Sequence, residues 1–190
     1  AADITPPTGT IAINNGAAAT NKTDAALSLT WDDGTGYGVA RMCLRSNGTD
    51  WPAWEPVAAA RAWTLPAGDG YKTVLVMYAD TVDNRSVVYN DYILLDTAPP
   101  TGSILINGGA STTASQDVTL NLAWADTGAG VVRMRFSDNG STWTNWESLK
   151  PARAYTLPAG AGYHTVRVQF LDNAGNYSIA YNDYIKLVTP

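Results

Sequence analysis

The stretch Leu27-Ser28-Leu29-Thr30-Trp31 decides the fold, because Leu120-Asn121-Leu122-Ala123-Trp124 repeats it 93 residues later. In both copies, large apolar side chains alternate with small or polar ones. This period of two is that of a β-strand with one buried face. We therefore expect a strand at each place, with its leucines and its tryptophan directed toward a core.

The repeat extends over the whole chain. Thr5-Pro6-Pro7-Thr8-Gly9 recurs as Ala98-Pro99-Pro100-Thr101-Gly102, and Tyr89-Asn90-Asp91-Tyr92-Ile93 recurs as Tyr181-Asn182-Asp183-Tyr184-Ile185. A repeated unit of about 93 residues is long enough to bury a core of its own. The sequence therefore predicts two domains, residues 1–97 and 98–190. Their boundary lies at a Pro-Pro pair, which excludes helix and stiffens the link.

Strands with the same period of two recur within each copy. Val132, Met134 and Phe136 alternate with arginines, and Asp138-Asn139-Gly140 follows, which predicts a hairpin with a type I′ turn. Each copy has about seven such strands separated by turn signals. This pattern is typical of an all-β protein made of two tandem seven-stranded immunoglobulin-like sandwiches. We expect Trp31 and Trp124 to be buried at matching places in the two cores.

Four motifs resemble known families. The Leu-x-Leu-x-Trp strand resembles strand B of fibronectin type III domains, and Leu65 and Leu157, each six residues before a tyrosine, resemble the tyrosine corner of that family. The linker 96–102 and the turn 172–178 resemble tandem Ig-like repeats of bacterial surface and secreted proteins. The resemblance implies that the hydroxyls of Tyr71 and Tyr163, the tyrosines of those corners, bond to the backbone upstream.

The first copy departs from the resemblance in one turn. Asp80-Thr81-Val82-Asp83-Asn84 lacks the glycine that its counterpart has at Gly175. The resemblance therefore leaves the shape of this loop open in the first copy.

Composition excludes several function classes. The formal net charge is −5 and the pI is about 4.6, whereas a nucleic-acid-binding protein needs a basic surface stripe. No run of 18 apolar residues is present, so no transmembrane helix is expected. The single cysteine, Cys43, excludes an intrachain disulfide and a cysteine-based zinc site.

Several residues that would suit catalysis in one copy have no equivalent in the other. The only histidine, His164, aligns with Lys72, and Cys43 aligns with Arg135. The acidic residues that would suit a glycosidase pair are Asp32-Asp33, Asp80 and Asp83, but Asp32 aligns with Ala125 and Asp83 with Gly175. Acids at turns bond their own backbone as a rule. We therefore expect that the chain is not an enzyme.

Calcium is the one cofactor that the sequence suggests. The oxygen-rich loop Asp172-Asn173-Ala174-Gly175-Asn176, with the interdomain Asp96, offers ligands that suit Ca²⁺. The alternative is a simple turn in which aspartate bonds its own backbone. No other cofactor is expected.

Paired tryptophans are the most distinctive candidate surface. Each copy has a Trp-x-x-Trp motif: Trp51 and Trp54, then Trp143 and Trp146. Exposed indoles stack on sugar rings, which would make the chain a carbohydrate-binding accessory domain. Alternatively, the indoles pack under arginines as part of the scaffold, and the candidate arginines are Arg41 and Arg133. We favour the scaffold, because both copies carry the pair.

These observations favour a mechanical or adhesive role. We expect a spacer or stalk segment of a secreted or surface-anchored bacterial protein. Its partners would be neighbouring repeats of the same longer chain, since both termini resemble pieces of the linker. Two domains placed end to end would span roughly 70–80 Å, from a rise of 3.3 Å per strand residue. Polysaccharide binding and self-association into an extracellular filament through sheet edges are the alternatives.

Overall fold

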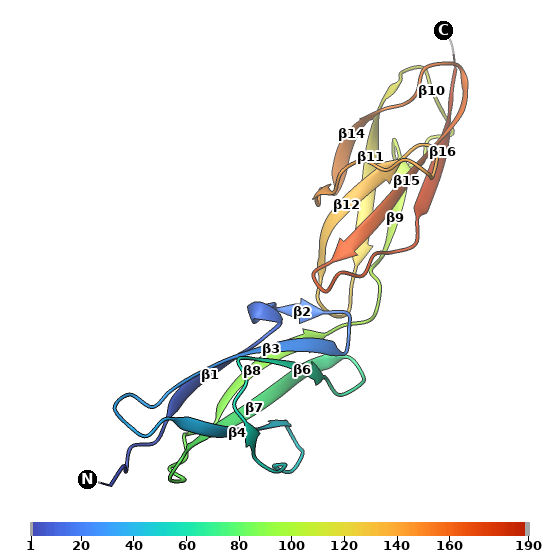
Figure 1. The fold of residues 1–190 in the computed structure, drawn as a ribbon. Helices are drawn as coiled ribbons and strands as arrows, with labels where there is room; N and C mark the ends of the chain where they lie inside the picture. The colour runs from blue at the N-terminus through green and yellow to red at the C-terminus, as the bar shows by residue number, and fades with distance from the viewer. Residues whose placement is uncertain (1, 189–190) are drawn as a thin grey trace. The chain divides into compact units, whose positions relative to one another are not determined.

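The computed structural model describes residues 2–188 of the chain. The chain divides into two compact units, Ala1–Thr97 and Ala98–Pro190 (Figure 1). Each unit is a sandwich of one three-stranded and one five-stranded sheet. The predicted all-β class and sandwich architecture are confirmed.

The first domain orders its sheets as β1-β3-β6 and β2-β8-β7-β4-β5. Its strands are β1 (Thr8–Ile13), β2 (Ala19–Thr20), β3 (Asp24–Asp32), β4 (Val39–Ser46), β5 (Glu55–Pro56), β6 (Ala60–Thr64), β7 (Gly70–Asp80) and β8 (Tyr89–Leu95). A short 3₁₀ turn, Asn14–Gly16, follows β1.

The second domain repeats this topology as β14-β11-β9 and β10-β16-β15-β12-β13. Its strands are β9 (Thr101–Ile106), β10 (Thr112–Thr113), β11 (Asp117–Ala125), β12 (Val131–Ser137), β13 (Glu147–Ser148), β14 (Ala152–Thr156), β15 (Gly162–Asp172) and β16 (Tyr181–Leu187). Over the described residues each domain therefore has eight strands rather than seven. The count rises because two strands in each domain are only two residues long.

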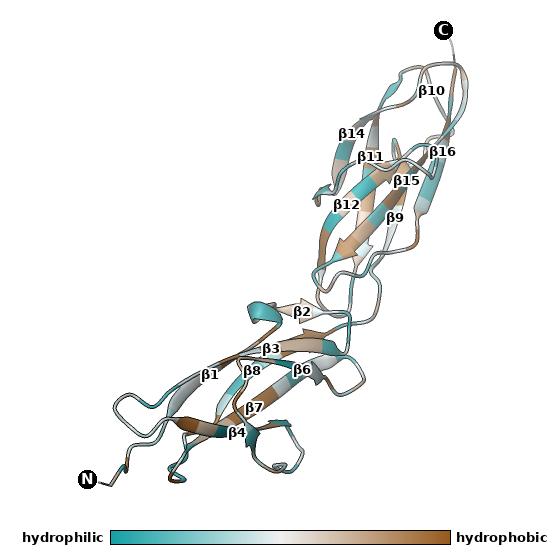
Figure 2. Ribbon diagram, viewed as in Figure 1, coloured by the Kyte–Doolittle hydropathy of each residue, from teal (hydrophilic) through white to brown (hydrophobic). Residues whose placement is uncertain are grey.

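The cores follow the alternation in the sequence. Figure 2 shows hydrophobic and hydrophilic residues alternating along strands such as β12. Leu27 and Leu29 are buried on β3, and their counterparts Leu120 and Leu122 are buried on β11. Apolar side chains from both sheets thus meet between the layers, as the period of two requires.

The tryptophans of this motif lie less deep than predicted. Trp31 and Trp124 are half-buried and pack against the edge of their cores. Each is the penultimate residue of its strand, so its ring lies near the end of the sandwich. The centres are filled instead by Tyr78 and Phe170, which are fully buried.

A glycine on the first strand of each domain makes room for the central ring. A Cβ atom at Gly9 would collide with the ring of Tyr78 and would lie 2.5 Å from the carbonyl oxygen of Thr30. Gly102 faces Phe170 in the same way. The repeated Thr-Gly of the sequence is therefore a packing requirement, because any side chain here would displace the aromatic ring.

The turn after β12 differs from the prediction. A type I′ turn needs positive φ at both central residues, but only Gly140 has one, at 79°. The side chain of Asn139 instead accepts hydrogen bonds from the backbone N–H groups of Ser141 and Thr142. The residues after β12 therefore form a wider loop that leads to β13. Because β13 pairs antiparallel with β12, the predicted hairpin is present, but its type I′ turn is wrong.

The loop after β7 keeps the same design without its glycine. Asp83 adopts a φ of 72°, where the equivalent Gly175 has 98°. Aspartate enters this left-handed region more readily than most residues. Oδ1 of Asp80 accepts the backbone N–H of Asn84 at 2.8 Å, and Oδ1 of Asp172 accepts the equivalent N–H at 2.8 Å.

The first domain begins at one end of its sandwich and finishes at the other. At one end of β7, Asn84 donates its side-chain N–H to the backbone oxygen of Asp3 at 3.1 Å. At the other end of β7, Gly70 pairs with Leu95, the last residue of β8. The chain therefore traverses the length of the sandwich.

The second domain follows the same path. Asn176, after the last residue of β15, donates its side-chain N–H to the backbone oxygen of Ala98 at 3.4 Å. Gly162, the first residue of β15, pairs with Leu187. Thus each domain, taken by itself, separates its incoming and outgoing chain by the length of its longest strand.

Candidate functional site

The tryptophans of the first domain lie under arginines. Trp51 and Trp54 are half-buried in the loop between β4 and β5. The guanidinium of Arg45 lies 4.7 Å from the centre of the Trp51 ring. Those of Arg41 and Arg85 lie 5.7 and 5.4 Å from the centre of the Trp54 ring. All three distances are within the range of cation–π attraction.

The second domain reaches a similar result with a single arginine. The guanidinium of Arg135 lies 4.9 Å from the ring centre of Trp143 and 4.5 Å from that of Trp146. Gln169, its partner across the β12–β15 ladder, accepts hydrogen bonds from Arg135 at 3.0 and 2.7 Å. Arg133, the predicted partner of the tryptophans, is exposed instead.

The sequence carried a signal for Arg135. It lies two residues after Arg133 on the same strand, so both side chains point to the same face of the sheet. The prediction named Arg133, the counterpart of Arg41, because both alternate outward from their strands, and it did not extend to Arg135. The first copy has Cys43 at the position of Arg135, so this arginine has no counterpart there.

The tyrosines predicted to form tyrosine corners are exposed. Tyr71 and Tyr163 are each 70% exposed, and each packs its ring edge-on against a second tyrosine. The ring centres are 5.7 Å apart for Tyr71 and Tyr92, and 6.0 Å apart for Tyr163 and Tyr184. The prediction of two tyrosine corners is therefore wrong.

The alternation along β7 explains this exposure. Val74, Val76 and Tyr78 are buried, so every even-numbered residue of this part of the strand faces the core. Tyr71 is odd-numbered and lies on the outer face. The same argument places Tyr163 outside on β15.

Three carboxylates of the first domain converge. One oxygen of Asp3, one of Asp33 and one of Asp80 all lie within 4.8 Å of one another, so this group is able to hold a metal ion. Burial tends to raise the pKa of Asp80, but hydrogen bonds from Asn84, Val82 and Asp83 outweigh it and lower the pKa. Asp80 is therefore ionised at neutral pH.

The loop predicted to bind calcium is well bonded internally. Oδ1 of Asp172 accepts three backbone N–H groups, those of Ala174, Gly175 and Asn176. Its Oδ2 accepts the side-chain N–H of Asn176 at 2.8 Å. These are the bonds of an aspartate turn, and they leave the calcium prediction for this loop a proposal.

The two residues considered for catalysis belong to different domains. His164 is in the second domain, where its Nε2 is 2.8 Å from the backbone oxygen of Gly160. Cys43 is buried in the first domain, and burial raises the pKa of its thiol in spite of the opposing charge of Arg85. A neutral buried thiol is a poor nucleophile.

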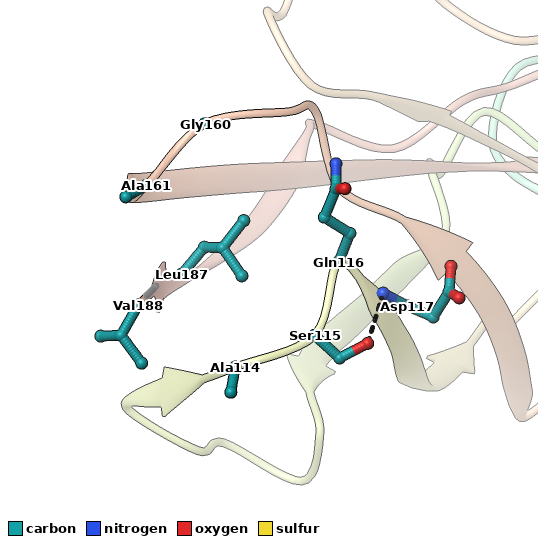
Figure 3. Close-up of a pocket in the computed structure, with 8 residues that line it drawn as sticks. All are labelled: Ala114, Ser115, Gln116, Asp117, Gly160, Ala161, Leu187 and Val188. Carbon is teal, nitrogen blue, oxygen red and sulfur yellow. Dashed lines mark hydrogen bonds between the residues drawn. The ribbon is translucent and has the colours of Figure 1, made fainter. Parts of the chain in front are cut away.

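A shallow pocket opens at one end of the second domain (Figure 3). In this pocket the hydroxyl of Ser115 accepts the backbone N–H of Asp117 at 3.1 Å. The pocket is lined by small, aliphatic and polar residues: Ala114, Ser115, Gln116, Asp117, Gly160, Ala161, Leu187 and Val188. One carboxylate without an acid or base partner in this lining does not make a catalytic group.

Over residues 2–188, no helix has both the length and the apolar character needed to cross a membrane.

Comparison with known proteins shows the fold. No family model matches the chain, and no curated protein matches it in sequence. Among solved structures, the fibronectin(III)-like modules of Clostridium thermocellum CbhA are 16% identical, with a TM-score of 0.56 over 95% of this chain and 94% of that chain. Three N-terminal domains of the outer capsid protein Hoc of bacteriophage RB49 are 14% identical, with a TM-score of 0.45 over 96% of this chain and 59% of that chain. A two-domain fibronectin type III segment of chicken tenascin is 12% identical, with a TM-score of 0.36 over 95% and 98% of the two chains. The likeness to the CbhA modules agrees with the two sandwiches described above, and the chain consists of two tandem domains with a fibronectin type III-like fold.

Proposed function

We propose that this chain is a non-catalytic structural spacer in an extracellular protein, most simply a bacterial one. The observation that carries the proposal is the path of each domain. The chain enters the first domain at Asp3, at one end of β7, and leaves it after Leu95, at the other end. The second domain repeats this arrangement. A domain of this kind adds the length of its sandwich to any chain that contains it.

The chemistry of the described surface supports a non-catalytic role. The arginines over the four tryptophans use those rings as packing surfaces within each domain. Cys43 is buried and the pKa of its thiol is raised, which disfavours a role as a nucleophile. The CbhA modules that share the fold are themselves described as fibronectin(III)-like modules, which accords with a modular role.

Small-angle X-ray scattering of the purified chain tests the spacer proposal. We expect a maximum dimension of roughly 70–80 Å, from two strand-long domains and a short linker. A value near 50 Å would mean that the domains do not add their lengths, and would contradict the proposal. Sedimentation at high protein concentration tests the filament alternative, which requires that the mass of the particles increase with protein concentration.

A second candidate function, carbohydrate binding, is favoured by the tyrosine pairs rather than by the tryptophans. Tyr92 and Tyr184 are 62% and 61% exposed, so with Tyr71 and Tyr163 they present two open aromatic surfaces. Isothermal titration against a panel of soluble polysaccharides tests this function. Binding that is lost in Tyr71→Ala/Tyr163→Ala and retained in Trp54→Ala would support it. An absence of binding across the panel would leave the spacer as the function.

A further inference from the structure

Three carboxylates meet at the end of the first domain where the chain enters it. Asp3 comes from the segment before β1, Asp33 follows β3 directly, and Asp80 is the last residue of β7. The oxygens that they contribute all lie within 4.8 Å of one another. Asp80 is 0% exposed and Asp33 is 9% exposed. Like charges held this close in a site with little water repel one another unless a cation is present.

No cationic side chain of the described residues supplies that charge. Among residues 2–188, no ion pair of 4.0 Å or less involves Asp3, Asp33 or Asp80. Arg41 and Arg85 are paired with Asp83 instead, at 3.0 and 3.2 Å. The negative charge of the three carboxylates is therefore balanced by a cation from solution.

A buried oxygen in this group lacks a hydrogen-bond partner. Oδ2 of Asp33 accepts the backbone N–H of Gly38 at 2.7 Å, but its Oδ1 is inaccessible to solvent and has no partner. Unpartnered buried acceptors are uncommon and unfavourable, and a bound water or ion is among the partners that satisfy them. The equivalent Asp126 of the second domain also has an Oδ1 without a hydrogen-bond partner. An unpartnered aspartate oxygen therefore recurs at the same position of both domains.

We propose that Asp3, Asp33 and Asp80 bind a calcium ion. Calcium takes six to eight oxygen ligands in flexible geometry, whereas magnesium demands near-ideal octahedral geometry and retains its waters. Three carboxylates from three separate segments, with no nitrogen or sulfur ligand among them, suit the larger hard cation. Water and backbone carbonyls complete the coordination.

The bonds already made by these groups show what the ion would do. The backbone N–H groups of Thr5 and Tyr37 donate to the carboxylate of Asp3 at 3.0 and 2.9 Å. A side chain at Gly36 would collide with the carboxylates of Asp33 and Asp3, so glycine lets the loop close around them. The ion would therefore join the segment before β1 to the loops that follow β3 and β7. This site is independent of the spacer function.

The test titrates calcium chloride into the full chain after treatment with EDTA, and follows binding by calorimetry and equilibrium dialysis. We expect binding with a Kd of roughly 10⁻⁴ to 10⁻³ M, typical of extracellular calcium modules. Calcium should raise the melting temperature by several degrees, because it binds the folded state alone. Magnesium at the same concentration should have a smaller effect. Hydrogen exchange at the N–H groups of Thr5 and Tyr37 should slow when calcium is added.

Three variants decide the assignment. Asp33→Asn and Asp3→Asn should each bind one calcium equivalent fewer than the parent chain. Asp24→Asn makes the same charge change at an exposed residue at the start of β3, and should bind as the parent does. Asp3 precedes β1, so its variant reports on the site even if Asp33→Asn fails to fold. Absence of calcium binding up to about 10 mM, tenfold above the weakest expected Kd, would overturn the proposal. Unchanged stoichiometry in the Asp3 variant would overturn it equally.

Discussion

The two domains share one topology but fill the centre of the sandwich with different aromatic residues. Tyr78 occupies the centre of the first core and Phe170 that of the second. The hydroxyl of Tyr78 donates to the backbone oxygen of Thr10 at 2.9 Å, so its polar group is satisfied. Each ring contacts the half-buried tryptophan of its domain, with centres 6.2 and 6.0 Å apart. The core therefore specifies ring volume and direction, and admits a hydroxyl only where the backbone accepts it.

The tryptophan loops differ in a second way. The first domain covers Trp51 and Trp54 with separate arginines. Among the described residues of the second domain, Arg135 alone lies by the rings of both Trp143 and Trp146. The first solution is redundant at Trp54, where Arg85 lies beside Arg41. In the second domain both cation–π contacts depend on the single side chain of Arg135. Substitutions should therefore affect the two domains unequally.

The largest expected effect comes from removing the central ring. Phe170→Ala should destabilise the second domain by about 3–5 kcal/mol, because it leaves a cavity in a fully buried site. The matched change Trp124→Ala should cost less, since that ring is only half-buried. Calorimetry with both domains present measures this as a shift of one unfolding transition. If Trp124→Ala costs as much stability as Phe170→Ala or more, Trp124 rather than Phe170 is the main residue of the core.

The second expected effect is a pH dependence that only the first domain derives from its central residue. Burial, with a smaller contribution from Tyr89, raises the pKa of Tyr78 to about 12 from its ordinary value of 10.0. The folded state then holds the phenolic proton more tightly than the unfolded state. Its stabilising effect is complete below pH 10 and is lost as the pH rises toward 12.

The magnitude follows from the size of that pKa shift. A shift of two units corresponds to a loss of about 2–3 kcal/mol by pH 12. Urea denaturation of the parent chain and of Tyr78→Phe, at pH 8 and pH 11.5, measures the difference. The variant should be slightly less stable at pH 8, because it lacks the hydrogen bond to Thr10, and it should lose less stability at high pH. Parallel losses in the two proteins would show that Tyr78 is not the group responsible.

The third expected effect concerns the arginines. Arg135→Ala should destabilise the second domain by about 1–2 kcal/mol, since two cation–π contacts of about 0.5–1 kcal/mol each are lost. Arg41→Ala should cost the first domain less, because Arg85 remains over Trp54. Thermal unfolding of the two variants checks the ranking. A greater loss of stability in Arg41→Ala than in Arg135→Ala would show that Arg85 does not compensate for Arg41 over Trp54.

The sequence predicted what depends on alternation and repetition. The period of two around Leu27 and Leu120 identified the strands, and the repeat identified two sandwiches. Alternation gives the face of a residue but not its depth, which is why Trp31 was placed too deep. Depth depends on where the opposite sheet ends, and that is a property of the assembled sandwich.

The candidate sites were less predictable because they depend on contacts between distant segments. Asp3, Asp33 and Asp80 share no motif, and only the topology brings the start of the chain beside the ends of β3 and β7. Arg133 and Arg135 both alternate outward on one strand, and alternation alone does not show which of them reaches the tryptophan rings. For Tyr71, the spacing from Leu65 was given more weight than the alternation from Val74, and the alternation was right.

The smallest expected effect tests that last point directly. Tyr163→Phe removes only a hydroxyl from a ring that is 70% exposed, and its contact with the Tyr184 ring does not require the hydroxyl. We therefore expect the stability to change by less than about 0.5 kcal/mol, as for most surface substitutions. A tyrosine corner would instead lose about 0.5–1.5 kcal/mol with its hydrogen bond. Tyr78→Phe, measured beside it by urea denaturation, is the matched control, since that change removes a bonded and buried hydroxyl. If Tyr163→Phe costs as much as Tyr78→Phe, the hydroxyl of Tyr163 has a partner, and the outward placement of this residue on β15 is wrong.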